Sequence, residues 1–492
     1  MLRLILALTL LPFAAQADPV RLKILTLDIW NGGDQISFNS VIKAIELADA
    51  DIVGPQEPYG KALQIAAPAG YPYAGQRRHI RLKCPIFDSA LGETTRTYAP
   101  PCSIAGLDPD AFHDWIKAAP GRVVAFANTH LTSDAYGPEL VRDGKTMGEV
   151  LQNETDLSTP EAQAVIDGLK PLIDKGVPLV PTDDFNSPSY RDWTTRTATH
   201  PFPILWPVSN AFEDAGFTDS FRTVHRDPAK DPGQTLIAGR PAPYIPPPET
   251  FDRIDFARTA NRKPIAAVVM SEAGNPQNAL SITPWPSDHR AVLTTIEVDP
   301  IPTPALISVE PRPVREGDSF FIRIALPDGS NYSATVFDRR QTTPITGLCN
   351  VAPDNRPTIR LSTIGLPQGD CDAVMTDAAG VEIARTRFAI VPHDGHATLQ
   401  TTATVTTTSD IALAFTGAPG FTLDWIGSYK KSDPSVYNYN GFAYTGARIN
   451  DTQTFPATDL YSPLTPGNYE ARLMLDDGCQ ITAAAPFTVG GP

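Results

Sequence analysis

The first 300 residues alternate between short apolar runs and amphipathic stretches, and several apolar runs end abruptly in polar side chains. The clearest example covers residues 177–186, where Val, Leu and Pro give way to Asp184, Phe185 and Asn186. Short apolar runs with β-branched members predict buried strands, and α/β enzymes commonly place their chemistry where such strands end. Residues 41–48 have the spacing of an amphipathic helix. The pattern therefore predicts an α/β fold for this part of the chain.

Other segments of the same part also end in groups that can bind a cation or move a proton. They carry Asp28 and Asn31, Glu57, Asn128 and His130, Asp252 with Arg253 and Asp255, and Asp288 with His289. Residues i and i+2 of a strand face the same side, so Asp184 and Asn186 should lie together. Asp252 and Asp255 should face opposite sides, and we favour Asp255 for the site. Each segment alone is also typical of an ordinary strand end or turn, but together they indicate one site.

After residue 300 the pattern changes to short alternating segments separated by Gly and Pro. Residues 299–304 are Pro-rich and predict a stiff linker. Residues 366–373 resemble residues 464–471, and a spacing near one hundred residues suits one β-sandwich per copy. We expect an α/β domain over residues 18–300, followed by two all-β immunoglobulin-like sandwiches over residues 303–393 and 394–492.

The N-terminus predicts export. Residues 1–17 combine Arg3, an apolar run over 4–13 and a small-x-small ending, which is typical of a cleaved signal peptide. No later apolar run is long enough to span a membrane, so we expect a periplasmic or secreted protein without a transmembrane anchor. Such a compartment permits disulfides. The five cysteines are Cys84, Cys102, Cys349, Cys371 and Cys479, and the local pairs 84 with 102 and 349 with 371 are one arrangement that the sequence leaves open.

The charge balance limits the ways in which this chain could bind nucleic acid. The formal net charge is -15, which disfavours a broad basic binding surface. An acidic enzyme can still bind a phosphate group through a divalent cation. Nothing in the composition implies a stable protein partner, and we expect a monomer.

Taken in order, the polar segments resemble the motifs of the endonuclease/exonuclease/phosphatase (DNase I-like) superfamily. The matched motifs are residues 26–30, 53–57, 128–131, 183–186, 252–255 and 287–289, and the likeness covers about residues 22–297. It implies a four-layer fold, in which two mixed β-sheets pack face to face with helices outside. It also implies one metal-dependent phosphoester site across the strand ends. Residues 185–194 resemble secreted bacterial members of the superfamily, and the chain is identified as such a member with C-terminal immunoglobulin-like domains.

The resemblance also implies a role for each residue of the predicted site. Asp28, Glu57 and Asp288 would bind Mg²⁺, with Mn²⁺ or Ca²⁺ as alternatives, and His130, Asp184, Asn186, Asp255 and His289 would be catalytic. Asn31, Asn128 and Arg253 would bind substrate. The residue types suit this chemistry, because carboxylates hold a hard cation that screens the phosphate charge, and Asp and His can transfer protons near neutral pH. Which histidine is the acid and which the base stays open.

Three positions depart from the superfamily pattern, namely Asp28 in place of Asn, Asp183 in place of Gly, and Pro55 in place of an apolar residue. None of them removes a catalytic group. We therefore expect an exported hydrolase of phosphodiesters, with nuclease activity as its most general form. The alternatives are a phospholipid hydrolase of the sphingomyelinase type, a phosphomonoester hydrolase, and a non-catalytic surface binding protein. The substrate would be nucleic acid or a phospholipid head group.

Overall fold

The structure is a computed structural model of the 492-residue chain. It describes residues 19–58, 61–66, 68–71, 73–75, 80–82, 86–88, 92–94, 113–119, 121–133, 135–197, 201–238, 250–274, 278–310, 314–325, 332–338, 344–346, 358–393, 396–419, 424–433, 439–446, 448–460, 462–474 and 481–491. The predicted signal peptide and four cysteines (Cys84, Cys102, Cys349 and Cys479) lie outside these ranges. Cys371 is buried among the apolar residues of a later β-sheet pair. The disulfide pairs stay a prediction.

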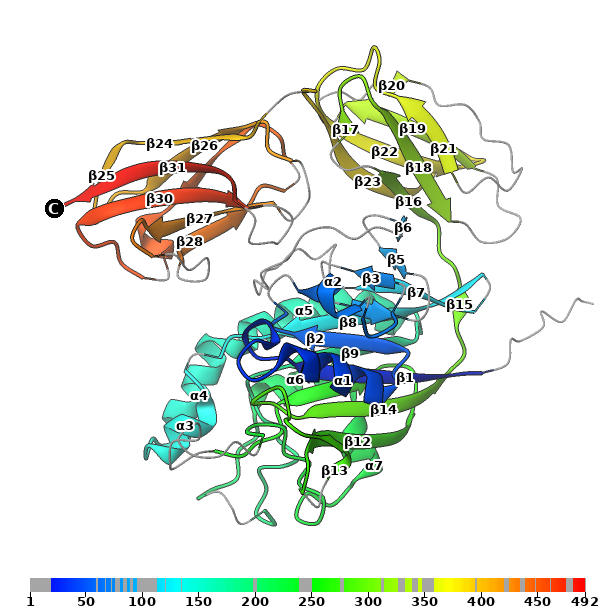
Figure 1. The fold of residues 1–492 in the computed structure, drawn as a ribbon, viewed down its shortest axis with the longest axis vertical. Coiled ribbons are helices and arrows are strands. Elements are labelled where there is room, and N and C mark those ends of the chain that lie inside the picture. The colour runs from blue at the N-terminus through cyan, green and yellow to red at the C-terminus, as the bar shows by residue number, and fades with distance from the viewer. Residues whose placement is uncertain are drawn as a thin grey trace, which may run out of the picture.

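Two mixed β-sheets form the first part of the chain, as the sequence predicted (Figure 1). The first sheet has the order β13-β12-β14-β1-β2-β4-β3, with bounds β1 Val20–Asp28, β2 Ile52–Gln56, β3 Tyr73–Gly75, β4 Ile80–Leu82, β12 Pro264–Glu272, β13 Asn278–Ile282 and β14 Ala291–Val298. Strand β1 runs parallel to β2 and antiparallel to β14, with Val20 opposite Val298. The first strand of this sheet is therefore paired with its last.

The second sheet has the order β10-β11-β9-β8-β7-β5-β6, and β15 also pairs with β8. Its strands are β5 Ile86–Asp88, β6 Gly92–Thr94, β7 Asp114–Ala119, β8 Arg122–His130, β9 Leu179–Asp184, β10 Thr218–Asp219, β11 Asp255–Thr259 and β15 Ile301–Pro302. Strands β8 and β9 are parallel, and β11 runs antiparallel to β9 with Asp255 opposite Asp184. This register brings two of the predicted site residues together.

Seven helices accompany these sheets among the described residues. They are α1 Phe38–Ala48, α2 Ala62–Ala66, α3 Gly137–Arg142, α4 Met147–Asp156, α5 Ser158–Asp174, α6 Pro207–Asp214 and α7 Ser220–Val224. A short 3-10 turn, η1 Asn31–Gly33, follows β1. The start of α4 is fixed by a capping box, in which Thr146 and Glu149 bond each other's backbone N–H. Within the described part of the chain, no helix is both long enough and apolar enough to cross a membrane.

Alternation along the central strands explains the four layers. On β1, Leu25 and Leu27 face outward and pack against α1 and the Ile65 side chain of α2. Leu22 and Ile24 face the other way, into an apolar core shared with β8 and β9 between the two sheets. Helices α5 and α6 cover the outer face of the second sheet. A strand buried on both faces has to be apolar on both, which is why these strands read as nearly continuous apolar runs.

An all-β region follows, as predicted, and consists of two pairs of sheets with three and five strands in each pair (Figure 1). The first pair contains β16 Leu306–Glu310, β17 Val314–Arg315, β18 Ser319–Ala325, β19 Tyr332–Asp338, β20 Pro344–Thr346, β21 Thr358–Ser362, β22 Gly369–Asp377 and β23 Glu382–Val391. The second contains β24 Thr398–Thr401, β25 Thr404–Thr406, β26 Ile411–Thr416, β27 Trp425–Lys430, β28 Tyr439–Tyr444, β29 Asp451–Phe455, β30 Gly467–Met474 and β31 Ile481–Gly490. Each pair encloses its own apolar core.

The Pro-rich segment that we expected to be a free linker is instead bonded to the α/β part. Ile301 and Pro302 form β15, which lies antiparallel to the start of β8. The backbone N–H of Thr303 donates to the carbonyl oxygen of Gly121 at 2.9 Å. Leu306 is buried in the apolar cluster beneath α5 and α6. The chain thus stays attached to the α/β part for several residues past residue 300.

Candidate active site

The strands that face each other across the two sheets end in acidic or histidine side chains. The side chains that face the space between the two sheets are Leu22, Ile24, Thr26 and Asp28 on β1, Val124, Phe126, Asn128 and His130 on β8, and Val180, Thr182 and Asp184 on β9. Each row is apolar in the middle of its strand and polar at the carboxyl end. Because side chains repeat every second residue, the strands that build the inner core also place these three terminal groups at one edge of it.

The first group of potential ligand atoms comes from Asp28, Glu57 and His130, which lie within 4.8 Å of one another. Glu57 directly follows β2 and has a positive φ of 52°. Its carboxylate accepts a hydrogen bond from the backbone N–H of Asn31 at 2.6 Å, and its carbonyl oxygen accepts one from Gly32 at 2.8 Å. These bonds hold the turn after β1 against the end of β2, so two sequence-distant carboxylates meet.

Asp28 is buried beside this turn, and its carboxylate accepts a hydrogen bond from the backbone N–H of Trp30 at 2.7 Å. Burial and then the negative charge of Glu57 raise the pKa of Asp28 well above its usual value, although the charge of His289 opposes this. A cation between the two carboxylates would relieve their repulsion. The oxygen donors of Asp28 and Glu57 fit Mg²⁺, which commonly binds one or two protein carboxylates and keeps several waters.

The second group consists of Asp184, Asp255 and His289, all of them buried. Nδ1 of His289 lies 3.0 Å from Oδ2 of Asp255 and 3.8 Å from Oδ2 of Asp184. The other oxygen of Asp255, Oδ1, is buried and receives no hydrogen bond from the described residues. A buried carboxylate oxygen without a donor is costly, so a water, a cation or a substrate group is needed there.

His289 is held in its charged form by its surroundings. Burial lowers its pKa, but the negative charges of Asp255 and Asp184 and the hydrogen bond to Asp255 outweigh this effect. The pKa of His289 therefore lies well above its ordinary value. The resulting imidazolium donates through Nδ1 to Asp255 and leaves its other N–H as a positively charged donor.

Asp184 has the properties of a base that works near neutral pH. Burial raises its pKa to about 6, partly offset by the positive charge of His289. The backbone N–H of Asn186 donates to Oδ1 at 2.9 Å and fixes the carboxylate. Above its pKa Asp184 is ionised, and it is basic enough to accept a proton from a nearby water.

Asn186 connects the two groups. Its Nδ2 lies 3.0 Å from Nε2 of His130 and donates to the carbonyl oxygen of Leu131 at 3.0 Å. The same ring nitrogen of His130 is 3.6 Å from Oδ2 of Asp184. The structure thus brings His130, Asp184, Asn186, Asp255 and His289 together, the five residues predicted to be catalytic.

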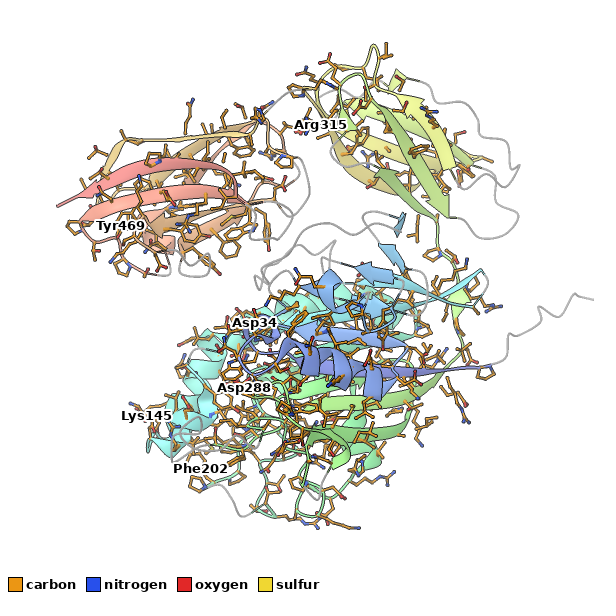
Figure 2. All side chains as sticks on the ribbon, in the orientation of Figure 1. Asp34, Lys145, Phe202, Asp288, Arg315 and Tyr469 are labelled. Carbon is orange, nitrogen blue, oxygen red and sulfur yellow. The ribbon has the colours of Figure 1, made fainter. Side chains whose placement is uncertain are left out.

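Asp288 and Asn31 lie at the edge of this arrangement. The negative charge of Asp288 is one of the causes that raise the pKa of Asp28, but its carboxylate belongs to neither group of ligand atoms. Figure 2 labels Asp288 and Asp34, the residue after η1, on the same side of the sheets. Asn31 contributes its backbone N–H to Glu57, and its side chain is exposed. Asp288 is therefore beside the predicted metal group rather than inside it.

Asn128 has a different role from the substrate binding that we predicted. Its Oδ1 accepts hydrogen bonds from Gln56 at 2.8 Å and from Thr182 at 2.7 Å, and its Nδ2 donates to the carbonyl oxygen of Pro55 at 3.0 Å. These partners belong to β2 and β9, so the amide bridges the two sheets. Its hydrogen-bonding groups are used within the protein, and we assign Asn128 to positioning the strands.

The predicted substrate contact of Arg253 is also corrected by the structure. Its guanidinium is buried and donates to Asp192 at 2.8 Å and to the two oxygens of Asp219 at 3.1 and 2.6 Å. It also lies over the rings of Phe221 and Phe256. All three of its nitrogens donate into a buried ion-pair network, so Arg253 cannot reach a substrate without breaking these bonds.

Asp252 bonds to Tyr136, a residue near the site that the sequence analysis missed. Asp252 accepts hydrogen bonds from the indole N–H of Trp193 at 2.9 Å and the hydroxyl of Tyr136 at 3.2 Å. Burial and the charges of Asp252 and Asp184 raise the pKa of Tyr136 well above its usual value. No strand end or motif marks Tyr136, which precedes a short helix. Asp255 rather than Asp252 contacts a histidine.

Asp183, the acid that departs from the superfamily pattern, lies on the opposite face of β9 from Asp184. It is buried and accepts a hydrogen bond from the hydroxyl of Thr129. Burial raises its pKa to about 7, with Thr129 and the charge of Arg258 acting in the opposite direction. The second carboxylate therefore adds no ligand to either group of the site.

Comparisons with known proteins add the following. No family model matches the chain. An uncharacterized protein from Caenorhabditis elegans is 26% identical over 288 residues, which is 55% of this chain and 90% of that protein.

The structural neighbours include endonuclease/exonuclease/phosphatase proteins. One is an endonuclease/exonuclease/phosphatase from Beutenbergia cavernae, with 14% identity, a TM-score of 0.33 and coverage of 75% of this chain and all of that one. Another is an AP endonuclease from Archaeoglobus fulgidus, with 17% identity, a TM-score of 0.34 and coverage of 56% and 100%. The catalytic domain of APE2 from Xenopus laevis has 16% identity, a TM-score of 0.33 and coverage of 57% and 93%. These similarities are distant, so the function has to be argued from the side chains.

Proposed function

We propose that this chain is a metal-dependent hydrolase of phosphodiesters, with nucleic acid as its most general substrate. The observation that carries the proposal is the meeting of two carboxylate and histidine groups at one edge of the paired sheets. One group offers carboxylate oxygens, which are suitable ligands for a hard cation. The other offers an ionisable acid and a charged imidazole within 4 Å of each other.

In this proposal Asp28 and Glu57 hold a divalent cation, for which Mg²⁺ is the best fit. When bound, the cation would screen the negative charge of the phosphate and stabilise the charge that develops in the transition state. The hydrogen bonds from Asn31 and Trp30 orient the two carboxylates. Asp288 lies close enough to add negative charge to this side of the site.

The other side of the site supplies proton transfer and charge stabilisation. Asp184, with a pKa of about 6, takes a proton from the attacking water. His289 remains protonated and stabilises negative charge on the phosphate oxygens, while Asp255 orients its ring. His130, hydrogen bonded to Asn186, is placed next to Asp184 to protonate the leaving oxygen or to stabilise its charge.

The proposal is tested by assaying the purified chain on plasmid DNA, bis-(p-nitrophenyl) phosphate, p-nitrophenyl phosphate and sphingomyelin. Each assay is run with Mg²⁺ and with EDTA. We expect turnover of the diester and of DNA that EDTA abolishes. Glu57→Gln should lower kcat by about 10²-fold to 10⁴-fold at a fixed Mg²⁺ concentration and require more Mg²⁺ for half-maximal rate.

Glu297→Gln is a matched control, because Glu297 is an exposed carboxylate paired with Arg21 at 3.2 Å. It should retain the full rate. Cleavage of sphingomyelin without cleavage of DNA would show that the protein is a lipid hydrolase and not a nuclease. Turnover of the monoester alone would identify a phosphatase. A chain that turns over none of the four esters would support the non-catalytic alternative.

We also propose that the protein is exported, on the basis of the leader pattern over residues 1–17. Cell fractionation of a bacterial host that expresses the full chain should recover it outside the cytoplasm. N-terminal sequencing should find the mature chain starting near Asp18. Recovery of the intact N-terminus in the cytoplasm would refute export.

A further inference from the structure

A pocket of about 710 Å³ lies between the loop that follows Asn186 and the region of α7, and none of the predicted site residues lines it. Four arginines and three threonines contribute to its walls, and the arginines are Arg191, Arg196, Arg222 and Arg226. Among the described residues that line it, none is acidic. Three of these arginines pair with carboxylates just outside the lining, namely Glu213, Asp227 and Asp192, so the walls of the pocket present guanidinium groups while the acids lie behind them.

The walls of the pocket are fixed by the buried guanidinium of Arg222. It donates to the carboxylate of Asp192, in the loop that follows Asn186, and to the carbonyl oxygens of His225, Asp231 and Pro232, in the segment that follows α7. Only 2% of the Arg222 side chain is exposed, so these bonds are shielded from water. One buried side chain thus joins two loops, and the pocket is a built feature of the fold.

The remaining arginines keep donors available for a ligand. Arg191 pairs with Glu213, and Arg196 pairs with Asp227 at 3.1 Å through one of its terminal nitrogens. Both side chains are largely exposed, at 44% and 71%. Arg226 is exposed, and no described residue forms a hydrogen bond or ion pair with it. The pocket therefore has one positive charge without a partner, together with unused N–H groups on its neighbours.

These features match the chemistry of a phosphate group. A planar guanidinium presents paired N–H donors to phosphate oxygens, and a threonine hydroxyl such as that of Thr195 adds a neutral donor. The volume exceeds that of a single phosphate and lies in the usual range of small-molecule sites. We propose that this pocket binds a small ligand that carries at least two phosphate charges, independently of the hydrolytic site and of its proposed function.

The test is isothermal titration of the full chain with pyrophosphate in the presence of EDTA. EDTA removes divalent cations, so the proposed hydrolytic site cannot hold phosphate through a metal. We expect one binding event that weakens as NaCl is raised, because exposed ion pairs are screened by salt. Arg226→Gln should weaken binding by about tenfold or more, as expected when a charge-assisted hydrogen bond is lost. Arg196→Gln combined with it should weaken binding further.

Two control variants separate this pocket from the rest of the molecule. Arg21→Gln removes an exposed arginine outside the pocket, and Glu57→Gln alters the hydrolytic site. Both should bind pyrophosphate as tightly as the unaltered chain. If a nucleoside diphosphate binds and Arg226→Gln weakens its binding as well, the result would support the proposed pocket and show that a nucleotide can supply the phosphate groups. The proposal is overturned if the unaltered chain binds no pyrophosphate, if Arg226→Gln leaves the affinity unchanged, or if Glu57→Gln abolishes binding.

Discussion

Asp255 and Asp252 are only three positions apart, yet they have different partners. Asp255 contacts the ring of His289 at 3.0 Å, whereas Asp252 accepts bonds from Trp193 and Tyr136. Of these two carboxylates, Asp255 is therefore the one that, together with Asp184, keeps His289 charged. Replacing each aspartate by asparagine therefore tests which of the two supports His289.

Asp255→Asn should lower kcat by about 10²-fold to 10⁴-fold, because His289 loses the partner that orients and charges it. Removal of this negative charge lowers the pKa of His289, so the alkaline limb of the pH-rate profile should move to lower pH. Asp252→Asn should change kcat much less and leave that limb in place. Steady-state kinetics of both variants on bis-(p-nitrophenyl) phosphate provide the measurement. Equal losses in the two variants would contradict the assignment of Asp255.

Glu154 on α4 is a buried acid that makes stability depend on pH. The residue is 1% exposed, and its carboxylate accepts a hydrogen bond from the hydroxyl of Ser187 at 2.7 Å. Burial raises its pKa from 4.5 to about 7, against the effect of Ser187. The folded chain therefore holds this proton more tightly than the unfolded chain does. The contribution of Glu154 to stability is greatest below pH 4.5 and is lost as the pH rises towards 7.

Glu154→Gln should remove this loss, because the amide oxygen can still accept from Ser187 and carries no charge. Relative to the unaltered chain, the free energy of unfolding should rise between pH 5 and pH 8 by up to roughly 3 kcal/mol. Urea unfolding at several pH values measures the difference. Asp156→Asn, which alters an exposed acid on the same helix, is the control and should show no such trend. A pH-independent difference for Glu154→Gln would show that Glu154 is not titrating.

At the scale of strands, the two halves of the site are held together by a polar row between the sheets. Gln56 on β2 donates to Thr26 on β1 and to Asn128 on β8, and Asn128 also accepts from Thr182 on β9. Gly54 lies against this row, where a β-carbon would approach Asn128 Oδ1 to 2.6 Å and Thr182 more closely still. The close approach of β2 to the second sheet therefore requires glycine at this position.

Gly54→Ala should lower the free energy of unfolding by about 1 to 3 kcal/mol, the usual cost of overpacking. It should also reduce kcat, because the shift of β2 moves Glu57 away from Asp28. Gly148→Ala is the control, since a β-carbon there meets nothing within 4 Å and alanine favours the helix α4. Thermal unfolding and diester hydrolysis should be measured on both. A Gly54→Ala chain as stable as Gly148→Ala would show that the sheets can separate without cost.

The sequence was a good guide to the elements because alternation is a local property. The helix near residues 41–48 and the apolar strands could be predicted from neighbouring residues. Asp184 and Asn186 do lie together, but not through strand alternation, because β9 ends at Asp184 and Asn186 has a positive φ of 47°. The partners of Arg253 could not, since Asp192 and Asp219 are 61 and 34 positions away. The bonding partners of Asn128 are also distant in the sequence, and we therefore wrongly predicted that Asn128 binds substrate. Its bonding partners are on other strands, and only the packing of the two sheets brings them together.

For the whole molecule, the attachment of β15 to β8 decides where the chain can be divided. A chain that ends at Leu306 keeps β15, the bond from Thr303 and the buried Leu306 side chain. We expect it to hydrolyse small diesters with the kcat of the full chain, because every residue of the candidate site is retained. A chain that ends at Val298 lacks β15 and leaves Arg122 and Val123 at the start of β8 without this neighbour, so its melting temperature should be lower.

Diester hydrolysis and thermal unfolding of the two shortened chains and the full chain test this expectation. A large fall in kcat for the chain that ends at Leu306 would mean that the β-sandwiches take part in the chemistry. Equal melting temperatures for the two shortened chains would mean that β15 adds no stability.

The pairing of β1 with β14 also determines when the protein can become active during its synthesis. Asp28 and Glu57 leave the ribosome early, but β1 gains its second neighbour only after residue 298 has been made. His289 lies two residues before that closing strand. A nascent chain that has not yet reached residue 298 therefore holds the parts of the candidate site as separate segments, and the proposed hydrolysis has to wait for the closing strand.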